Sequence, residues 1–282
     1  MQIRIIPAAE VHRKILEAIG AISFAPDSAV TDMLLKAVEL EQDETRKDVL
    51  NSMLTNIHLA RENKIPLCQD TGTLVVFAYI GNRVVIDGAP LQDIINQALA
   101  EATAHLYLRA SILIDPLFNR VNSGNNCPAI LHLNIVDGDE LTLMIAQKGG
   151  GAENMSRLKM FSPDASPEEI EQFVMETVTL AGAKACPPLV IGIGIGGNFE
   201  VCAKLAKQAL FSPISKEKET TYSAWETRIQ DTINKSGIGV QGMGGQLTAL
   251  AVNILCAPCH IASLPVAVNL QCHAHRHITI RM

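Results

Sequence analysis

The order of apolar segments along this chain limits its fold more than any other feature. Helical periodicity fills the chain up to about residue 62, and strand-like and helical segments then follow one another without strict alternation. Parallel βαβ folds need that alternation, so the order favours an α+β fold in which a mixed β-sheet is covered by helices, after a helical N-terminal section. We expect helices over residues 11–22, 28–40, 44–62, 90–106, 167–184, 199–210 and 222–236, and strands over 73–80, 84–86, 129–135, 141–146, 189–195, 247–255 and 266–270.

The short apolar run at residues 84–86 follows the turn residues Gly81-Asn82, so we expect it to pair back on the preceding strand as a hairpin. The chain has no repeat, no low-complexity tract and no clear linker, and we expect residues 1–282 to form a single domain. The charged run Lys216-Glu217-Lys218-Glu219 comes nearest to a boundary, and we interpret it as a solvated loop.

Composition excludes several classes of function. Of the 282 residues 48% are hydrophobic and only 4% aromatic, and the net charge is −6. Binding to nucleic acid or to an anionic membrane surface would need a basic face. No apolar run approaches the roughly 20 residues that cross a bilayer. The first seven residues have neither the apolar region nor the cleavage site of a signal peptide, so we expect a cytoplasmic protein.

The seven cysteines do not indicate a disulfide scaffold, because their number is odd and the expected compartment is reducing. One of them, Cys68, lies in the segment Pro66–Thr73 with Gln69 and Asp70, on a turn that leads into an apolar strand. A buried carboxylate is costly unless it is paired or used, and turns at strand ends often carry chemistry. Alone, the Cys-Gln-Asp sequence is weak evidence, since a free cysteine is most often a small buried hydrophobe.

Two glycine runs follow strands. Residues 192–197 fit the G-x-G-x-x-G pattern of dinucleotide sites, but no acidic residue occurs at the distance expected for binding ribose. We therefore regard a nucleotide oxidoreductase as a minor alternative, and expect these glycines to allow close approach of other backbone. The second run, Lys148-Gly149-Gly150-Gly151, is either a flexible turn or an amide-lined pocket for a carboxylate or phosphate.

The segment Cys256-Ala257-Pro258-Cys259-His260 resembles half of a zinc site. Its only candidate for a second half is the Cys272–His277 segment. A zinc-stabilised binding module is accordingly a second alternative, although Cys256 closes an apolar strand and suits a buried thiol better.

Three cysteines stand where apolar segments meet polar or proline-containing chain: Cys68, Cys186 and Cys272. Three separated thiolates suit a [4Fe–4S] cluster that keeps one iron free of protein ligand, able to act as a Lewis acid on a hydroxyl or carboxylate. Spacing alone does not distinguish this from three buried cysteines, because a C-x₂-C-x₂-C run is absent.

Five segments in one order carry a family resemblance. They are residues 67–72, 148–156, 185–188 with the glycine-rich continuation, 237–242 and 272–276. Together they resemble the α subunit, or N-terminal domain, of class I iron–sulfur fumarate hydratases and the related L-tartrate dehydratases. The resemblance extends from about Leu16 to Arg276 and is specific for the family more than for the substrate.

The resemblance implies a [4Fe–4S] hydro-lyase that acts on a dicarboxylate, with Cys68, Cys186 and Cys272 as the cluster ligands. It further implies that Gln69, Asp70, Arg109, Gly150 and His260 contact the substrate, and that Asp70 and His260 are catalytic. An amide nest, a cation and a His–Asp pair near a metal agree with the needs of a dicarboxylate. Without the family, Arg109 would be interpreted as a surface residue and His260 as a core histidine.

The chain ends ten residues after Cys272, whereas single-chain members of the family continue into a second domain. We therefore expect a separate β subunit, a hetero-oligomer, and no activity without that partner. The prediction is the α subunit of a fumarate hydratase that interconverts fumarate and (S)-malate. L-tartrate dehydratase, or another C4/C5 dicarboxylate hydro-lyase, is the near alternative.

Overall fold

The computed structural model describes residues 3–214 and 222–282, which form two compact units. The first unit comprises residues 1–27, 56–150 and 276–282, and the second comprises residues 28–55 and 151–275. Both are α+β, which confirms the predicted fold class. The prediction of one domain over residues 1–282 stays a prediction, and the charged run at residues 216–219 lies outside the described residues.

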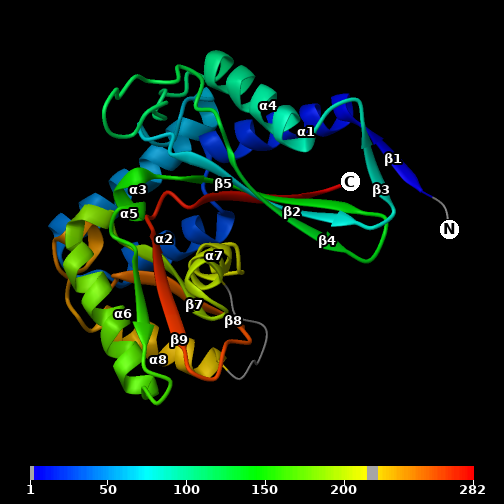
Figure 1. Cartoon of the computed structure of the whole chain (residues 1–282). Helices are drawn as coiled ribbons and strands as arrows, with labels where there is room; N and C mark the ends of the chain where they lie inside the picture. Colours follow the sequence, from blue (N-terminus) through cyan, green and yellow to red (C-terminus); the bar gives the residue numbers. More distant parts are fainter. Residues whose placement is uncertain (1–2, 215–221) are drawn as a thin grey trace. The chain divides into compact units, whose positions relative to one another are not determined.

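The first unit contains a four-stranded mixed sheet in the order β10-β5-β2-β4. Strand β2 pairs in parallel with β4 and antiparallel with β5, and β10 pairs antiparallel with β5. Helices α1 and α4 pack together on one face of this sheet (Figure 1), where their apolar residues form one core with alternate residues of β2 and β5. The elements are β1 (Arg4–Pro7), α1 (Ala8–Phe24), β2 (Thr73–Gly81), β3 (Val84–Asp87), α4 (Leu91–His105), β4 (Ile130–Val136), β5 (Leu141–Lys148) and β10 (Arg276–Arg281).

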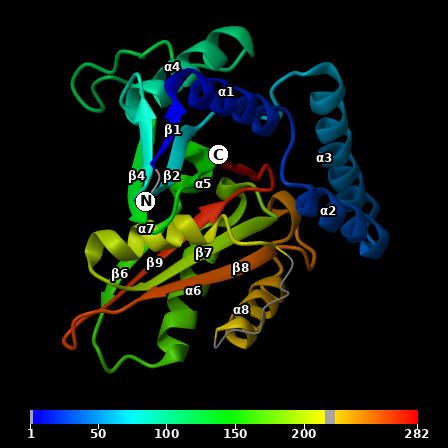
Figure 2. The ribbon, with the colours of Figure 1, turned by 90° about the vertical axis from the view of Figure 1, so that its right-hand side faces the viewer.

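The second unit contains a four-stranded mixed sheet in the order β6-β9-β7-β8. Helix α7 lies on one face and helices α6 and α8 on the other (Figure 2), so the strands are covered on both sides. The elements are α2 (Ser28–Leu40), β6 (Arg157–Phe161), α6 (Pro167–Ala181), η1 (Gly182–Ala185), β7 (Leu189–Gly196), α7 (Phe199–Ala209), α8 (Ser223–Asn234), η2 (Val240–Gly242), β8 (Ala249–Ala257) and β9 (Leu264–Gln271). Helices α3 (Glu44–Asn63) and α5 (Gly150–Glu153) include residues of both units.

The predicted hairpin at residues 84–86 is wrong. Strand β3 pairs in parallel with β1 in a separate two-stranded sheet, with Ile5 opposite Val85. Both edges of β2 are already taken, one by β4 and the other by β5, so no edge of β2 is left for β3. The other predicted helices and strands are present, with ends displaced by a few residues.

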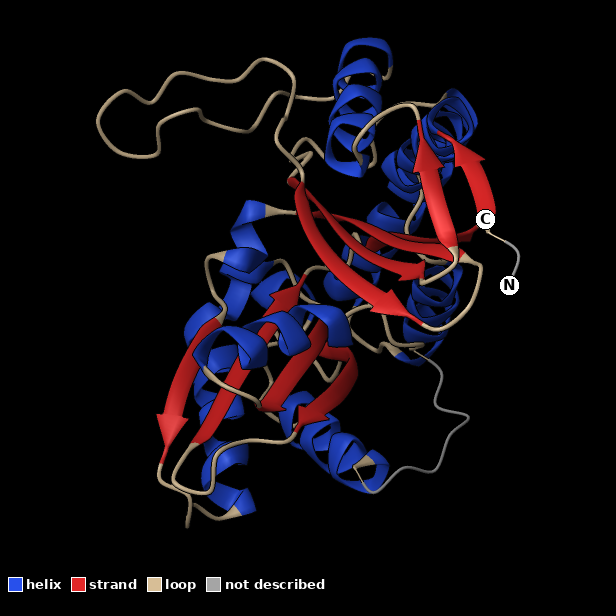
Figure 3. Ribbon diagram, turned by 45° about the vertical axis from the view of Figure 1, so that its right-hand side comes forward, coloured by secondary structure: helices blue, strands red, loops and turns tan. Residues whose placement is uncertain are grey.

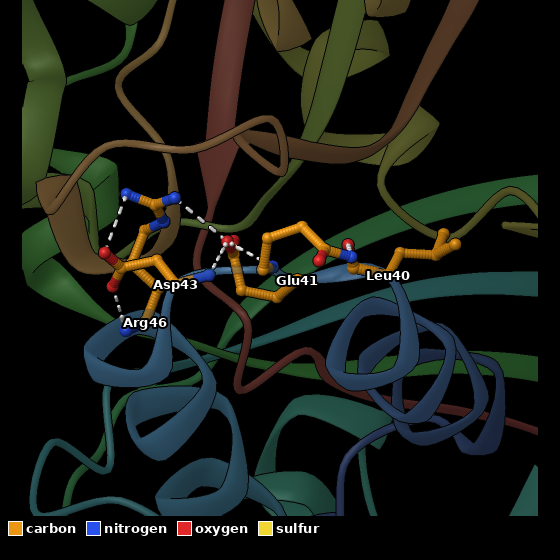
Figure 4. A network of polar contacts seen from close by, with 5 residues as sticks. Leu40, Glu41, Asp43 and Arg46 are labelled. Carbon is orange, nitrogen blue, oxygen red and sulfur yellow. Dashed lines mark hydrogen bonds and ion pairs between the residues drawn. The ribbon is translucent and has the colours of Figure 1, made fainter.

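The turn between α2 and α3 is closed by a polar network (Figure 4). The Glu41 Oε1 atom accepts hydrogen bonds from the backbone of Gln42 and Asp43 and from Arg46 Nη2, the last at 2.9 Å. The Arg46 hydrogen bond is the largest cause that lowers the pKa of Glu41. This arrangement ends one helix and starts the next within three residues.

Helix α4 and strand β4 are joined by a long loop, residues 106–129, drawn in tan in Figure 3. Arg109 lies near its start. None of the described helices has the length and apolar character that a membrane span requires.

Candidate functional site

The Cys68 turn connects α3 to β2 and is fastened at its backbone. The N–H of Leu67 donates to the Ser23 carbonyl at 2.8 Å, and the Asn56 side chain donates to the Leu67 carbonyl at 2.9 Å. Cys68 is half-buried, and its Sγ donates to Gln69 Oε1 at 3.5 Å. The thiol and the amide that the sequence predicts as ligand and substrate contact are therefore neighbours on one anchored turn.

Asp70 is the best-defined residue of the turn. Its Oδ1 accepts from the Gly72 N–H at 2.9 Å, and its Oδ2 accepts from the Gly150 N–H at 2.7 Å. The structure therefore brings Asp70 and Gly150, two of the predicted substrate contacts, into direct contact, with the Gly150 amide directed at Asp70.

Two glycines make this approach possible. Gly72 has φ +74°, and a Cβ there would lie 2.4 Å from the Lys148 carbonyl oxygen. A Cβ on Gly149 would lie 3.1 Å from Asp70 Oδ2. Within the glycine run at residues 149–151, the Gly150 amide thus donates to the carboxylate of Asp70. The predicted pocket for a bound carboxylate or phosphate stays a prediction.

Arg109 is held close to this turn by its backbone. Its carbonyl accepts from Thr71 Oγ1 at 2.8 Å and from Asn126 Nδ2 at 3.1 Å. The residue itself is exposed. The contact from Thr71, the residue after Asp70, therefore places the backbone of Arg109 beside the Cys68 turn, and the predicted contact of its side chain with substrate stays a prediction.

In the second unit, Cys186 and Cys272 flank the same end of the sheet. Cys186 precedes β7 and has left-handed backbone, with φ 55°, and Cys272 directly follows β9. Strands β7 and β9 are antiparallel neighbours, with Val190 opposite Gln271. The backbone N–H of His273 donates to the Cys186 carbonyl at 3.4 Å, and its Nδ1 lies 3.1 Å from the same oxygen.

Gln241 belongs to this end of the sheet as well, and sequence analysis gave it no role. Its backbone N–H and its Nε2 both donate to the Pro187 carbonyl at 2.9 Å, and Nε2 lies 3.3 Å from His273 Nδ1. The only signal in the sequence was its position between glycines in the segment 237–242. It joins that segment to the two that carry Cys186 and Cys272.

His260 lies elsewhere in the second unit. It is an exposed residue of the turn between β8 and β9, and its Nδ1 accepts from the Ala262 N–H at 3.1 Å. Cys272 is at the other end of the eight-residue strand β9, which at about 3.3 Å per residue is a separation of roughly 25 Å. Within one chain His260 therefore does not meet Cys272, and its predicted catalytic and substrate-binding roles stay predictions.

The zinc alternative gains no support. Within the described residues, no group of three or more His, Cys, Asp and Glu side chains is placed to hold a metal ion, so Cys256, Cys259 and His260 do not form a zinc site. The Cys259 thiol instead donates to the Ser263 carbonyl at 3.3 Å. Desolvation raises the pKa of the Cys256 thiol, which disfavours the thiolate that zinc would need. The residue as a whole is exposed, so the expectation of a buried thiol at the end of this strand is wrong.

The remaining cysteines contrast with the three predicted ligands. Burial is the main cause that raises the pKa of Cys127 and of Cys202, so both favour the neutral thiol. Cys68, Cys186 and Cys272 form no disulfide and lie outside every helix and strand; Cys186 is exposed, and the other two are half-buried. Iron–sulfur clusters are bound by thiolates, which is the donor type that these three residues offer. That they hold one cluster together stays a prediction.

The glycine run at residues 192–197 does not form a nucleotide site. A Cβ on Gly192 would lie 2.0 Å from the Ala206 carbonyl oxygen, and one on Gly194 would lie 2.0 Å from the Cys202 carbonyl oxygen. Both oxygens belong to helix α7, which covers this face of β7. The glycines allow a helix to lie against the strand, and this explains the pattern without a dinucleotide.

Comparison with known proteins gives one consistent result. The family model described as "Fumarate hydratase (Fumerase)" matches residues 12–281. A "Putative L(+)-tartrate dehydratase subunit alpha" of Methanocaldococcus jannaschii is 39% identical over 261 residues, which are 90% of this chain and 90% of that protein. The "L(+)-tartrate dehydratase subunit alpha" of Escherichia coli strain K12 is 32% identical over 260 residues, 90% of this chain and 84% of the relative.

Proposed function

This chain belongs to the fumarate hydratase family, and we propose that it is the α subunit of an iron–sulfur hydro-lyase that interconverts fumarate and (S)-malate. The observation that supports this most is the contact between two of the family-like segments. Asp70 of the Cys68 turn accepts a hydrogen bond from Gly150 of the glycine run at 2.7 Å. A thiol, a carboxylate and directed amides at one anchored turn are what a metal-assisted reaction of a dicarboxylate requires.

Dehydration of L-tartrate is the second candidate. The relatives from M. jannaschii and E. coli that cover about 90% of the chain are both named as tartrate dehydratase α subunits, while the matching family model is named for fumarate hydratase. Both reactions add water to, or remove it from, a C4 dicarboxylate, so they need the same kinds of groups at the site.

We assign the roles as follows. Cys68, Cys186 and Cys272 would hold a [4Fe–4S] cluster, which when bound supplies a Lewis acid for the substrate hydroxyl and carboxylate. Gln69 and Arg109 would hold the substrate, Arg109 through the charge-assisted hydrogen bonds that a guanidinium makes to a carboxylate. Asp70 takes part in proton transfer. The Gly150 amide, which bonds Asp70 here, orients that carboxylate or the substrate.

A β subunit is part of the proposal. The relatives are named as α subunits, and we propose that this chain is active only in a hetero-oligomer with a partner that supplies further substrate contacts. His260, which lies far from Cys272 along β9, would serve the reaction from another position in that assembly.

The experiment is an anaerobic preparation of this chain with the product of a neighbouring β-subunit gene, after reconstitution with iron and sulfide. We expect brown protein with bound iron and sulfide, and activity on fumarate or on L-tartrate; the ratio of the two kcat/KM values identifies the substrate. Cys68→Ala should remove the cluster and the activity. The matched variant Cys259→Ala changes an exposed thiol outside the proposed ligand set and should keep both. Iron retention by Cys68→Ala would contradict the proposal.

A further inference from the structure

Arg276 is a buried cation that the proposed mechanism does not use. It is the first residue of β10 and is 2% exposed. Its Nη2 donates to the backbone carbonyl of Asp70 at 2.7 Å, and its Nη1 donates to Gln147 Oε1 at 3.3 Å. The guanidinium therefore joins the last strand of the chain to the Cys68 turn, across 206 positions of sequence.

The guanidinium is itself fixed in place. Gln147 is opposite Arg276 in the β5–β10 register, and its Nε2 donates to Ser23 Oγ at 2.8 Å. Ser23 Oγ in turn donates to the Ile19 carbonyl at 2.7 Å, within helix α1. Gln147 and Ser23 are both buried, with exposures of 1% each. Such a buried and connected polar chain holds a donor in one position.

The partners of Arg276 are unusual for a buried charge. Burial of an ionised group is costly, and proteins ordinarily offset the cost with a carboxylate. Among the described residues, Arg276 has hydrogen bonds to a carbonyl and a side-chain amide but no ion pair, and its Nε has no hydrogen-bond partner. A neutral side chain could hold β10 at less cost. The cation is therefore explained better by what it does for Asp70 than by the stability of the strand.

We propose that Arg276 is a positioning residue for Asp70 in the proton-transfer step. The inference rests on the proposed function, in which Asp70 has that role. Three donors hold Asp70 in this structure: the amides of Gly72 and Gly150 fix its carboxylate, and Arg276 fixes its carbonyl. Loss of the third leaves the carboxylate bonded but allows the peptide plane behind it to rotate. Displacement of about 1 Å at a reacting group can lower a rate by about 10²-fold.

The test uses the cluster-loaded complex with the β subunit and three variants. Arg276→Gln removes the cation. Arg276→Lys keeps the positive charge on a shorter side chain that lacks the paired N–H donors of a guanidinium. Arg281→Gln is the matched control. Arg281 is the exposed last residue of the same strand, so a loss due to β10 alone would appear there too. Iron content and the thermal unfolding midpoint are measured first, so that kcat is expressed per loaded and folded complex.

We expect kcat to fall about 10²-fold in Arg276→Gln and about 10-fold in Arg276→Lys, with KM within about twofold of the wild type. With substrate deuterated at the carbon that loses its proton, the isotope effect on dehydration should rise in both variants. It should not change in Arg281→Gln. A purely structural role would lower the folded fraction without altering the isotope effect. Wild-type kcat in Arg276→Gln, or a raised KM with an unchanged isotope effect, overturns the proposal.

A second readout does not depend on activity. Amide hydrogen exchange in the peptide that contains residues 68–72 should be faster in Arg276→Gln than in the wild type or in Arg281→Gln. Unchanged exchange overturns the inference, since Arg276 then does not hold the turn. A wild-type complex that acts on neither fumarate nor L-tartrate overturns the proposed function instead, and with it the catalytic role given to Asp70. Hydrogen exchange then still tests whether Arg276 fixes the turn.

Discussion

Helices cover the two four-stranded sheets to different extents, and the burial patterns of their strands differ accordingly. In β5 of the first sheet, buried residues alternate with half-buried ones from Leu141 to Ala146, because α1 and α4 pack on one face. In β7 of the second sheet every residue from Leu189 to Gly196 is buried, because helices pack on both faces. Coverage of a sheet, more than strand direction, therefore determines the pattern that a sequence shows.

The comparison also explains where glycine is placed. One face of β7 carries isoleucines that pack on α6 and α8, such as Ile191 and Ile193. The opposite face has Gly192 and Gly194, against which the backbone of α7 lies. Strand β5 has no glycine, and the residues on its second face are half-buried from Thr142 to Ala146. Glycine in a strand marks close approach of another backbone.

The largest expected effect is that of Gly194→Val in β7. The first added carbon would lie 2.0 Å from the Cys202 carbonyl oxygen, so α7 would have to move. We expect loss of more than about 3 kcal/mol in the free energy of unfolding, or failure to fold. Thr142→Val introduces the same side chain on the half-buried face of β5 and should change stability by less than about 0.5 kcal/mol. Urea denaturation measures both, and equal losses would contradict the comparison.

The alternation in β5 gives the next effect. Leu143 is fully buried in the core under α1 and α4, so Leu143→Ala should cost about 3 kcal/mol, within the range for leucine deletions in cores. Its neighbour Met144 is on the other face and half-buried, and Met144→Ala should cost less than half as much. If the two losses were equal, the second face of β5 would be covered as completely as the first.

Local pattern predicted most elements but not their partners. The 3.6-residue periodicity of residues 8–24 and 44–63, and the apolar runs that became β2 and β7, depend on each segment's own burial. The pairing of β3 with β1 depends on a competition: β4 and β5 occupy both edges of β2. The residues near 84–87 carry no information on this pairing, because β4 and β5, the strands that occupy the edges of β2, lie about 50 to 60 residues downstream.

The candidate site was predictable to a similar extent. The order of family-like segments predicted Cys68, Asp70 and Gly150, and the structure adds the hydrogen bond between the last two. The sequence alone could not predict the hydrogen bond from Arg276 to the Asp70 carbonyl, because a contact between residues 206 positions apart has no local signal. His260 is only twelve residues before Cys272 in sequence, but the extended strand β9 lies between them and holds the two residues far apart in space.

Helix α6 on the second sheet begins differently from α1 and α4 on the first, which predicts a smaller effect. Helix α6 starts with a capping box, in which the Ser166 side chain accepts from the Glu169 N–H and Glu169 accepts from the Ser166 N–H. Helices α1 and α4 follow Pro7 and Pro90 without a side-chain cap. Ser166→Ala should cost about 1 kcal/mol in urea denaturation. Ser52→Ala, at an exposed position of α3, is the control and should be nearly neutral.

The smallest expected effect concerns pH and the first sheet. His277 of β10 lies 3.4 Å from Asp27 (His277 Nε2 to Asp27 Oδ2), and its side chain is only 11% exposed. Burial is the larger influence and lowers the pKa of His277 below 6.5, while the charge of Asp27 raises it and offsets part of the shift. The unfolded chain therefore takes up a proton near pH 6.5 that the folded chain does not, and protonation favours unfolding.

Stability should accordingly be constant above about pH 7 and should fall as the pH decreases through 6.5 towards the lower folded-state pKa. The free energy of unfolding, measured between about pH 7.5 and 5.5, avoids the titration of most carboxylates. His277→Gln should flatten the profile in this window. The matched substitution His58→Gln, at an exposed histidine of α3, controls for the change from histidine to glutamine itself. A profile that keeps its slope in His277→Gln would mean that burial beside β5 does not govern this histidine, and that the first sheet is more open there than the comparison requires.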